Sequence, residues 1–358
     1  MLQFLTRRFL LLFPVLVGIL LVTFTIVRLI PGDPCVVMLG ERATPEKCEA
    51  FKERYGLNDN IGIQFGRYLA NMFRGDFGTS IRFGQPVVDI IAERLPMTIE
   101  LTIGAMLFST VFGILLGVIS AIRRNSIIDT LTMILANIGV SMPVFWLGLM
   151  LAYVFALLLK DTPFFIPPSG RFSSGVSLPS LIKVWGIENP EGFKKFVLDF
   201  LSNSVFWNCL FTGNWRPLKD ALWHLILPSV AVGTIPLAII ARITRSSLLE
   251  VMGLDYIRTA RAKGLIERVV ISKHAMRNAM IPIVTIVGIE TGALLSGAVL
   301  TETVFVLPGV GTALVAAILA RDYPVIQGFT LIIAIIFVVV NLVVDFSYAY
   351  LDPRIRLE

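Results

Sequence analysis

The segment DYIRTARAKGLIERVV, residues 255–270, decides the architecture because it is basic and polar yet lies between two strongly apolar runs. LILPSVAVGTIPLAIIA (225–241) precedes it, and AMIPIVTIVG (279–288) follows it. Four basic residues lie within the segment, and a fifth lies just upstream: Arg258, Arg261, Lys263, Arg268 and Arg245. A basic stretch between two apolar runs is typical of a loop that joins two membrane-spanning helices.

The composition supports a membrane protein. The 358 residues are 56% hydrophobic and only 16% charged, with a mean hydropathy of +0.80. A soluble globule of this size carries more charge. Windows of about 20 apolar residues occur at Phe9–Val27, Leu101–Ile122, Thr130–Leu159, Ala221–Ala241, Ala279–Leu300 and Tyr323–Val344, with Glu290 as the one charge among them. These windows predict an all-α polytopic membrane protein with six transmembrane helices.

The distribution of Lys and Arg predicts the orientation. If the N-terminus is cytoplasmic, the inner segments 1–8, 123–127, 242–278 and 352–358 contain 14 basic residues. The much longer outer segments 31–97, 160–222 and 301–324 contain 16. This density favours basic loops on the inside. Both termini and the segment 255–270 are therefore expected in the cytoplasm.

Two apolar stretches need separate interpretation. The N-terminal run MLQFLTRRFLLLFPVLVGILLV (1–22) continues apolar without a small-residue cleavage site, so we expect a retained helix, not a removed signal peptide. In the outer insert, FKKFVLDFLSNSVFWNCLF (193–211) is interrupted by Asp199 and Asn203. This pattern favours an interfacial helix over a seventh span.

Cysteines and catalytic motifs give little support to enzyme chemistry. Cys35 and Cys48 share the first outer loop, where a disulfide could persist, but two positions alone also fit two free thiols. The chain contains no GxxxxGK(S/T) phosphate loop, no HExxH and no CxxC. We therefore expect no metal or cofactor on this chain, no nucleic-acid partner, and an energy source supplied by a partner or an ion gradient.

The basic segment has the features of a docking helix. On a helix, Arg258, Arg261, Leu265 and Arg268 would share one face. The small residues Ala260 and Ala262 would let another surface approach closely, and Gly264 would end the helix as a C-terminal cap. The alternative is that the basic residues only fix the topology. Because two or three charges suffice for that, a long helical loop with a capping glycine is more than anchoring requires.

The chain resembles the permease subunits of bacterial ABC importers, specifically the dipeptide/oligopeptide/nickel branch and its first permease subunit. DYIRTARAKGL (255–265) and HAMRNAMIPIVT (274–285) are similar to the cytoplasmic coupling loop of that family. Arg258-Thr259-Ala260 occupies the place of the general Glu-Ala-Ala signature. The remaining matching motifs are RLIPGDP (28–34), GDFGTSI (75–81), ERLPMTIEL (93–101), RRNSIIDT (123–130), SMPVFWLGL (141–149), ETVFVLPGVG (302–311), ARDYPVIQG (320–328) and NLVVDFSYAYLDPRIR (341–356).

The resemblance implies the type I ABC importer membrane fold. Residues 1–97 would hold the first helix and an external loop, residues 98–347 the transmembrane domain, and residues 348–358 a short cytoplasmic tail. Within the domain, 160–222 would be an external insert and 242–278 the cytoplasmic coupling loop. The insert around 172–222 is similar to the longer form found in dipeptide permeases, which favours di- or oligopeptides over nickel, glutathione or oligosaccharides.

The resemblance also implies the partners. A second homologous permease, two cytoplasmic ABC ATPases that hold ATP and Mg, and an external solute-binding protein would assemble with this chain in the lipid of a bacterial cytoplasmic (inner) membrane. The ATPase-coupling residues would be Tyr256, Arg258, Thr259, Ala260, Arg261, Ala262, Lys263 and Gly264.

The substrate path is less closely specified. Glu290 is the carboxylate well inside a predicted span, where an ionisable group is a candidate for a functional site and could meet a peptide amine. A packing role is the alternative. Asn137, Ser141 and Trp146, around the SMP sequence at Pro143, are further candidates.

Two other functional classes stay open from the residues alone. An ion-driven secondary transporter would carry several midplane charges and repeated halves, whereas the spans offer Glu290. An intramembrane enzyme would need a paired catalytic set, and Asp345 near the end of the last span has no evident partner in the sequence.

Overall fold

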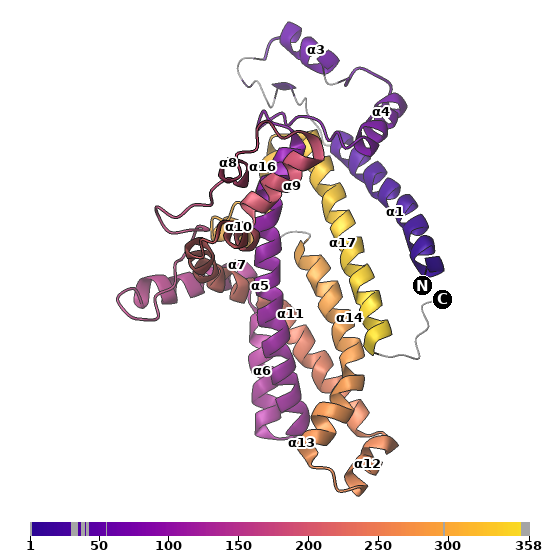
Figure 1. The fold of residues 1–358 in the computed structure, drawn as a ribbon, viewed down its shortest axis with the longest axis vertical. Coiled ribbons are helices and arrows are strands. Elements are labelled where there is room, and N and C mark those ends of the chain that lie inside the picture. The colour runs from indigo at the N-terminus through magenta and orange to yellow at the C-terminus, as the bar shows by residue number, and fades with distance from the viewer. Residues whose placement is uncertain are drawn as a thin grey trace.

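The computed structural model describes residues 2–29, 35–36, 40, 43–54, 56–295 and 298–351, and it is almost entirely helical (Figure 1). Across these residues the extended pairing is one isolated bridge between Thr79 and Pro86. The prediction of an all-α protein is confirmed.

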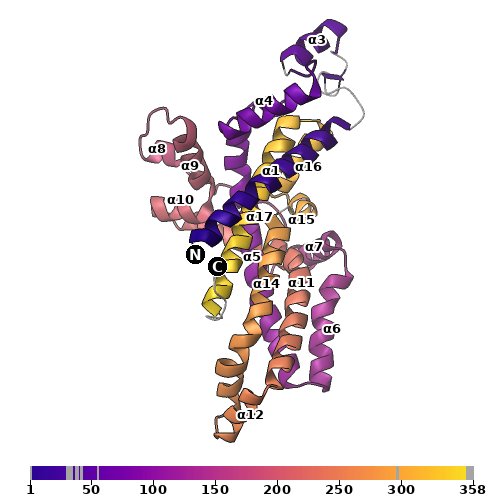
Figure 2. The same cartoon turned by 90° about the vertical axis from the view of Figure 1, so that its right-hand side faces the viewer.

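The long helices form an elongated bundle (Figures 1 and 2). They are α1 (Leu2–Leu29), α5 (Val87–Ile122), α6 (Ile127–Ser141), α11 (Arg216–Met252), α14 (Met276–Leu295) and α17 (Tyr323–Leu351). In the described part of the chain, four helical stretches are long and apolar enough to cross a membrane, or five if a bent pair counts as one span. α1 runs for 28 residues, but its side chains are described from Pro14 onward. The count of six spans therefore stays a prediction.

α5 and α11 form the centre of the bundle because small residues let their backbones approach closely. A Cβ atom at Gly113 would lie 2.9 Å from the Leu237 carbonyl oxygen, and one at Gly117 would lie 2.6 Å from that of Ala241. Ser109 Oγ donates a hydrogen bond across this interface to the Gly233 carbonyl, at 2.7 Å. Close small-residue packing of this kind holds helices together in lipid, where burial of apolar surface gives no net drive.

The third predicted span, Thr130–Leu159, is wrong as a continuous helix. The chain turns by 102° between α6 and the pair formed by α7 (Val144–Ala152) and the π-helix η2 (Tyr153–Leu158). Pro143 lacks a backbone N–H and disfavours helical geometry at the preceding residue, so Met142 is extended, with φ −107° and ψ 139°. Hydropathy continues across this turn, and a window of apolar residues therefore does not detect it.

The basic segment forms one end of the molecule. α12 (Asp255–Ala262) lies at the bottom of Figure 1 and is followed by α13 (Glu267–Val269) and the π-helix η3 (Val270–Ala275), which leads into α14. α14 ends at Leu295, so the predicted window Ala279–Leu300 extends past the helix. Short helices α15 (Val299–Val304) and α16 (Val310–Leu319) come next.

The half of the molecule away from α12 carries short helices, with α3 (Pro45–Arg54) and α4 (Ile61–Phe73) at its far end (Figure 1). It also carries α8 (Leu181–Val184), α9 (Gly192–Asn203) and α10 (Val205–Thr212). The stretch 193–211 therefore forms two helices of 12 and 8 residues, each too short to span a bilayer. Cys35 and Cys48 are joined by a disulfide, while Cys209 is buried as a free thiol.

Glu302 ties α15 and α16 to α5. Its carboxylate is fully buried and accepts hydrogen bonds from Thr98 Oγ1 at 2.7 Å and from the Thr312 backbone N–H at 3.0 Å. Thr98 Oγ1 in turn accepts from the Val310 N–H at 2.8 Å. The carboxylate therefore lies at the N-terminus of α16, where the helix dipole favours negative charge.

Candidate functional site

α12 is an amphipathic helix with one face packed on its own chain. Ile257 is fully buried and Ala260 is 8% exposed, and both pack in a cluster with Leu248 of α11 and with Val270 and Ala275 of η3. Tyr256 adds a polar tie, because its hydroxyl accepts from Asn278 Nδ2 at 2.7 Å and lies 3.4 Å from the His274 carbonyl oxygen. Movement of α12 would therefore be transmitted directly to α11 and α14.

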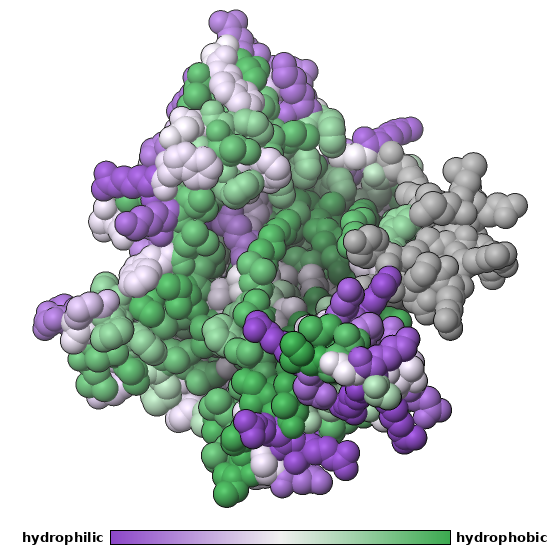
Figure 3. Space-filling model, turned by 60° about the horizontal axis from the view of Figure 1, so that its bottom comes forward, coloured by the Kyte–Doolittle hydropathy of each residue, from purple (hydrophilic) through white to green (hydrophobic). Residues whose placement is uncertain are grey.

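The burial of Ala260 corrects the expected docking face. Its small side chain lets α11 and η3 of the same chain pack closely against α12. The expectation that Ala260 lies on the surface that meets another molecule is therefore wrong. The outward surface is formed by the other residues of the segment: Arg258, Thr259, Arg261, Ala262, Lys263 and Gly264. Figure 3, which brings this end of the molecule forward, shows hydrophilic side chains gathered here beside strongly apolar flanks.

The C-terminus of α12 is a tight glycine cap, as the sequence predicts. Gly264 has φ +79°, its N–H donates to the Arg261 carbonyl at 2.9 Å, and the Leu265 N–H donates to that of Ala260 at 3.4 Å. These are the two hydrogen bonds of a Schellman motif. Because the chain reverses at Gly264, Arg268 lies on α13, and the predicted single face through Arg258, Arg261, Leu265 and Arg268 does not form.

An exposed ion pair closes the same turn. Arg261 Nη2 and Nε donate to the two carboxylate oxygens of Glu267, at 2.7 and 3.1 Å. These hydrogen bonds lower the pKa of the Glu267 carboxyl and raise the pKa of Arg261. Because both side chains are about half exposed, the pair contributes little stability by itself, about 0–1 kcal/mol. Its effect is to fix the direction of the chain after α12.

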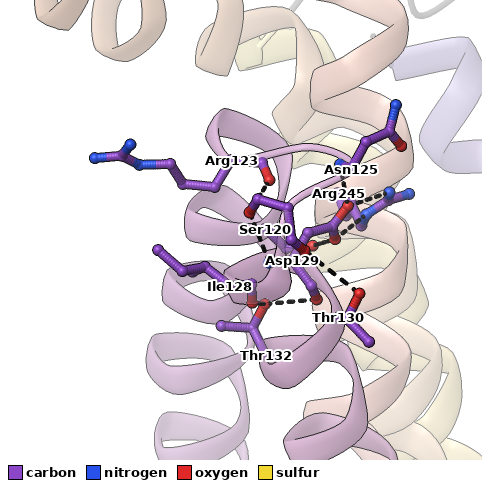
Figure 4. Close-up of polar contacts among 9 residues, drawn as sticks. Ser120, Arg123, Asn125, Ile128, Asp129, Thr130, Thr132 and Arg245 are labelled. Atoms are coloured by element: carbon purple, nitrogen blue, oxygen red, sulfur yellow. Dashed lines mark hydrogen bonds and ion pairs between the residues drawn. The ribbon is translucent and has the colours of Figure 1, made fainter.

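A polar cluster that sequence reasoning missed lies next to this end of the bundle, around Asp129 at the start of α6 (Figure 4). Asp129 is 5% exposed and receives two hydrogen bonds of 2.8 Å from Arg245 of α11. Ser120 Oγ of α5 and the Asn125 N–H donate to the same carboxylate. One buried carboxylate therefore joins α5, α6 and α11 just before the chain enters α12. Asp129 belongs to the motif RRNSIIDT, but Arg245 is 116 residues away.

The candidate path residues do not form one site. Asn137 and Ser141 lie one helical turn apart on α6, and Ser141 Oγ donates to the Asn137 carbonyl at 3.1 Å. Asn137 Oδ1 also accepts from the exposed Arg242 of α11, at 2.8 Å. Trp146 lies on α7, beyond the turn at Pro143, and is 42% exposed. Glu290 lies on α14, which the view in Figure 2 shows on the other side of α11 from α6.

The comparisons with known proteins assign the family. The protein-family model described as binding-protein-dependent transport system inner membrane component matches residues 113–357 of the sequence. A second family model, for the N-terminal part of such membrane components, matches residues 1–102. The chain belongs to the family of binding-protein-dependent transport system inner membrane components. This permease subunit is an integral, multi-pass membrane protein and not itself an enzyme.

Several relatives are similar over nearly their full lengths. The dipeptide transport system permease protein of Alkalihalophilus pseudofirmus is 46% identical over 99% of this chain and 100% of its own length. The protein of the same description from Escherichia coli strain K12 is 44% identical over 99% of both chains. The di/tripeptide transport system permease protein of Pseudomonas aeruginosa is 43% identical, also over 99% of both.

Proposed function

We propose that this permease imports dipeptides and that α12 is the element through which ATPase partners drive it. The names of the relatives support dipeptides over nickel, glutathione or oligosaccharides as the substrate. The observation that carries the coupling role is the position of α12. It forms the end of the bundle, presents a basic outward face, and is fixed to α11 and α14 by Ile257 and Tyr256.

In this mechanism the ATPase subunits hold ATP and Mg. This chain supplies part of the translocation path and the helix, α12, that transmits movement to it. Closure of two ATPases would move α12, and the rigid contacts of α12 would carry that movement into α11 and α14. A second permease subunit would complete the path, and an external solute-binding protein would deliver the peptide. The permease would lie in the inner membrane of a bacterial cell. Both of its termini and α12 would be on the cytoplasmic side.

The proposed docking surface is tested by filling it. Ala262 is exposed at the end of α12, so Ala262→Trp should leave the permease folded but hold the ATPase surface away. Overpacking an interface in this way costs about 1–3 kcal/mol, so co-purified ATPase should fall about tenfold. The measurement is affinity purification of the complex in detergent, followed by quantification of the ATPase subunits.

Ser174→Trp is the matched control, because Ser174 is also exposed but lies outside the segment around α12, in the insert 160–222. It should leave the amount of ATPase unchanged. Wild-type recovery of ATPase with Ala262→Trp would contradict docking at α12.

Glu290 is the second residue that we propose to act in transport. It is partly exposed on α14, and the structure gives it no hydrogen bond or ion pair among the residues that it describes. A charged group in a span faces a cavity or another subunit, so Glu290 would contact the peptide amine in the path. Glu290→Gln should lower dipeptide uptake about tenfold, the value of a lost charge-assisted hydrogen bond. Uptake of radiolabelled dipeptide by proteoliposomes measures this.

Assembly with the ATPases and basal ATP hydrolysis should stay normal in Glu290→Gln. Normal uptake, or failure to assemble, would leave Glu290 with a packing role at the permease interface. Asn137, Ser141 and Trp146 would then be the path residues to test next.

A further inference from the structure

A pocket of about 350 Å³ lies at the end of the molecule opposite α12, between α1, α4 and the start of α17. Figures 1 and 2 both place these three helices together at that end. Its volume is at the small end of the range for sites that bind small molecules. The contacts described above for α12, Asp129 and Glu290 do not involve this pocket.

Three hydrogen-bond donors from three different helices line it. They are Nη1 of Arg28 on α1, the hydroxyl of Tyr68 on α4, and Nε2 of Gln327 on α17. All three atoms are buried, and in the described part of the chain none has a hydrogen-bond partner. The Gln327 side chain belongs to a residue that is only 6% exposed. Because buried donors are nearly always paired in proteins, three unpaired donors on residues that line one pocket indicate a missing acceptor.

Neighbouring contacts hold these donors in place. Gln64 Oε1 accepts from Arg28 Nε and Nη2, at 3.0 and 2.7 Å, and Arg28 Nη1 has no partner among the described residues. The Arg28 guanidinium lies 3.5 Å from the centre of the Phe24 ring, and the Tyr68 ring stacks on Phe24 with centroids 5.8 Å apart. Arg28 and Tyr68 are therefore positioned on the same aromatic ring before any ligand arrives.

The charges of the pocket indicate a ligand with both signs. Arg28 and the two neutral donors suit a carboxylate, since Arg is the preferred partner of planar oxyanions. Two carboxylates, Glu53 and Asp76, line the same pocket. The second lining arginine, Arg67, is already paired with Asp59 at 2.8 Å. Arg28 is therefore the cation available to an oxyanion, and Glu53 and Asp76 are available to an ammonium group.

We propose that this pocket binds a free dipeptide on the external face, with its carboxylate on Arg28, Tyr68 and Gln327 and its ammonium group toward Glu53 and Asp76. The proposal rests on the dipeptide import proposed above and adds a peptide site on the permease itself. A phosphatidylethanolamine headgroup carries the same two charges, so the experiment must separate a peptide from a lipid.

The test is calorimetric titration of alanyl-alanine into the assembled transporter, without solute-binding protein, in nanodiscs of phosphatidylcholine. Alanyl-alanine should bind, and alanyl-alanine amide, which lacks the carboxylate, should bind at least about tenfold more weakly.

Arg28→Gln should weaken the binding of alanyl-alanine by a similar factor. Tyr68→Phe removes a single oxygen atom and should weaken binding about three- to tenfold with no change in thermal stability. Arg74→Gln is the matched control: Arg74 is an exposed arginine at the end of α4 outside the pocket, so binding should stay at the wild-type value.

Equal binding of the acid and the amide, or unchanged binding with both Arg28→Gln and Tyr68→Phe, would overturn the proposal. The proposal would also fail if the pocket held a lipid instead of a peptide. In that case phosphatidylethanolamine would co-purify with the wild type but not with Tyr68→Phe, and alanyl-alanine would not bind to either. Dipeptide uptake with the solute-binding protein present is measured in parallel. Uptake without direct binding would refute the pocket alone, whereas loss of all dipeptide uptake by the wild type would refute the proposed import.

Discussion

Asp129→Asn should lower the thermal stability of the permease more than a single substitution of any exposed or partly exposed charge at the α12 end, because the Asp129 carboxylate is buried. The change removes the charge that Arg245 binds through two hydrogen bonds of 2.8 Å, while keeping the shape of the side chain. Breaking a buried ion pair costs about 3–5 kcal/mol, because the remaining charge is left unpaired. Arg245 is 29% exposed, so we expect about 3 kcal/mol, which corresponds to roughly 5 °C in the melting temperature.

Two comparisons make this result specific. Arg242→Met changes an exposed arginine one turn earlier on α11, whose side chain donates to Asn137, and should shift the melting temperature by less than about 1 °C. The double variant Asp129→Asn, Arg245→Met removes the unpaired charge and should recover much of the loss. The measurement is a thermal unfolding series in one detergent. Equal shifts for Asp129→Asn and Arg242→Met would show that the ion pair contributes nothing beyond a surface contact.

Local sequence signals predicted the parts of the structure that depend on neighbouring residues. Gly264 follows a basic, alanine-rich stretch, and a glycine in that place predicts a left-handed cap because a residue without a Cβ adopts positive φ at no steric cost. The structure has this cap. The apolar windows likewise located α5, α11, α14 and α17, since span length is set by bilayer thickness.

Features that depend on the backbone path or on distant residues were not predictable in this way. The windows joined α6 to α7 because hydropathy does not record the direction of the chain, although Pro143 marked the turn. The inward side of Ala260 depends on where α11 and η3 lie. The Asp129–Arg245 pair depends on two helices meeting across 116 residues, and the donors Arg28, Tyr68 and Gln327 meet only because α1, α4 and α17 pack together.

Gly264→Val should uncouple transport from ATP hydrolysis while leaving the permease in the membrane. At φ +79° a β-branched side chain is strained by about 1–2 kcal/mol or more, whereas asparagine adopts this conformation readily. Apart from Gly264 and its two chain neighbours, no atom of the described residues lies within 4 Å of the position that a Cβ would take. The effect would therefore act through the backbone and not through a clash. Relief of that strain would open the hydrogen bonds from Gly264 and Leu265 and would separate Arg261 from Glu267. The end of α12 would then lose its fixed direction.

The measurement is peptide-stimulated ATP hydrolysis by the complex in proteoliposomes. Gly264→Val should reduce the stimulated rate about tenfold or more, a loss equivalent to about 1.4 kcal/mol of coupling. Gly264→Asn, the matched control at the same position, should retain most of the rate because its backbone keeps the cap. Basal hydrolysis by the ATPases should be similar in both variants, since ATP is bound on those subunits. If peptide stimulates ATP hydrolysis equally in Gly264→Val, Gly264→Asn and the wild type, the geometry of the cap is not needed for coupling. The basic segment would then act only as a topological anchor.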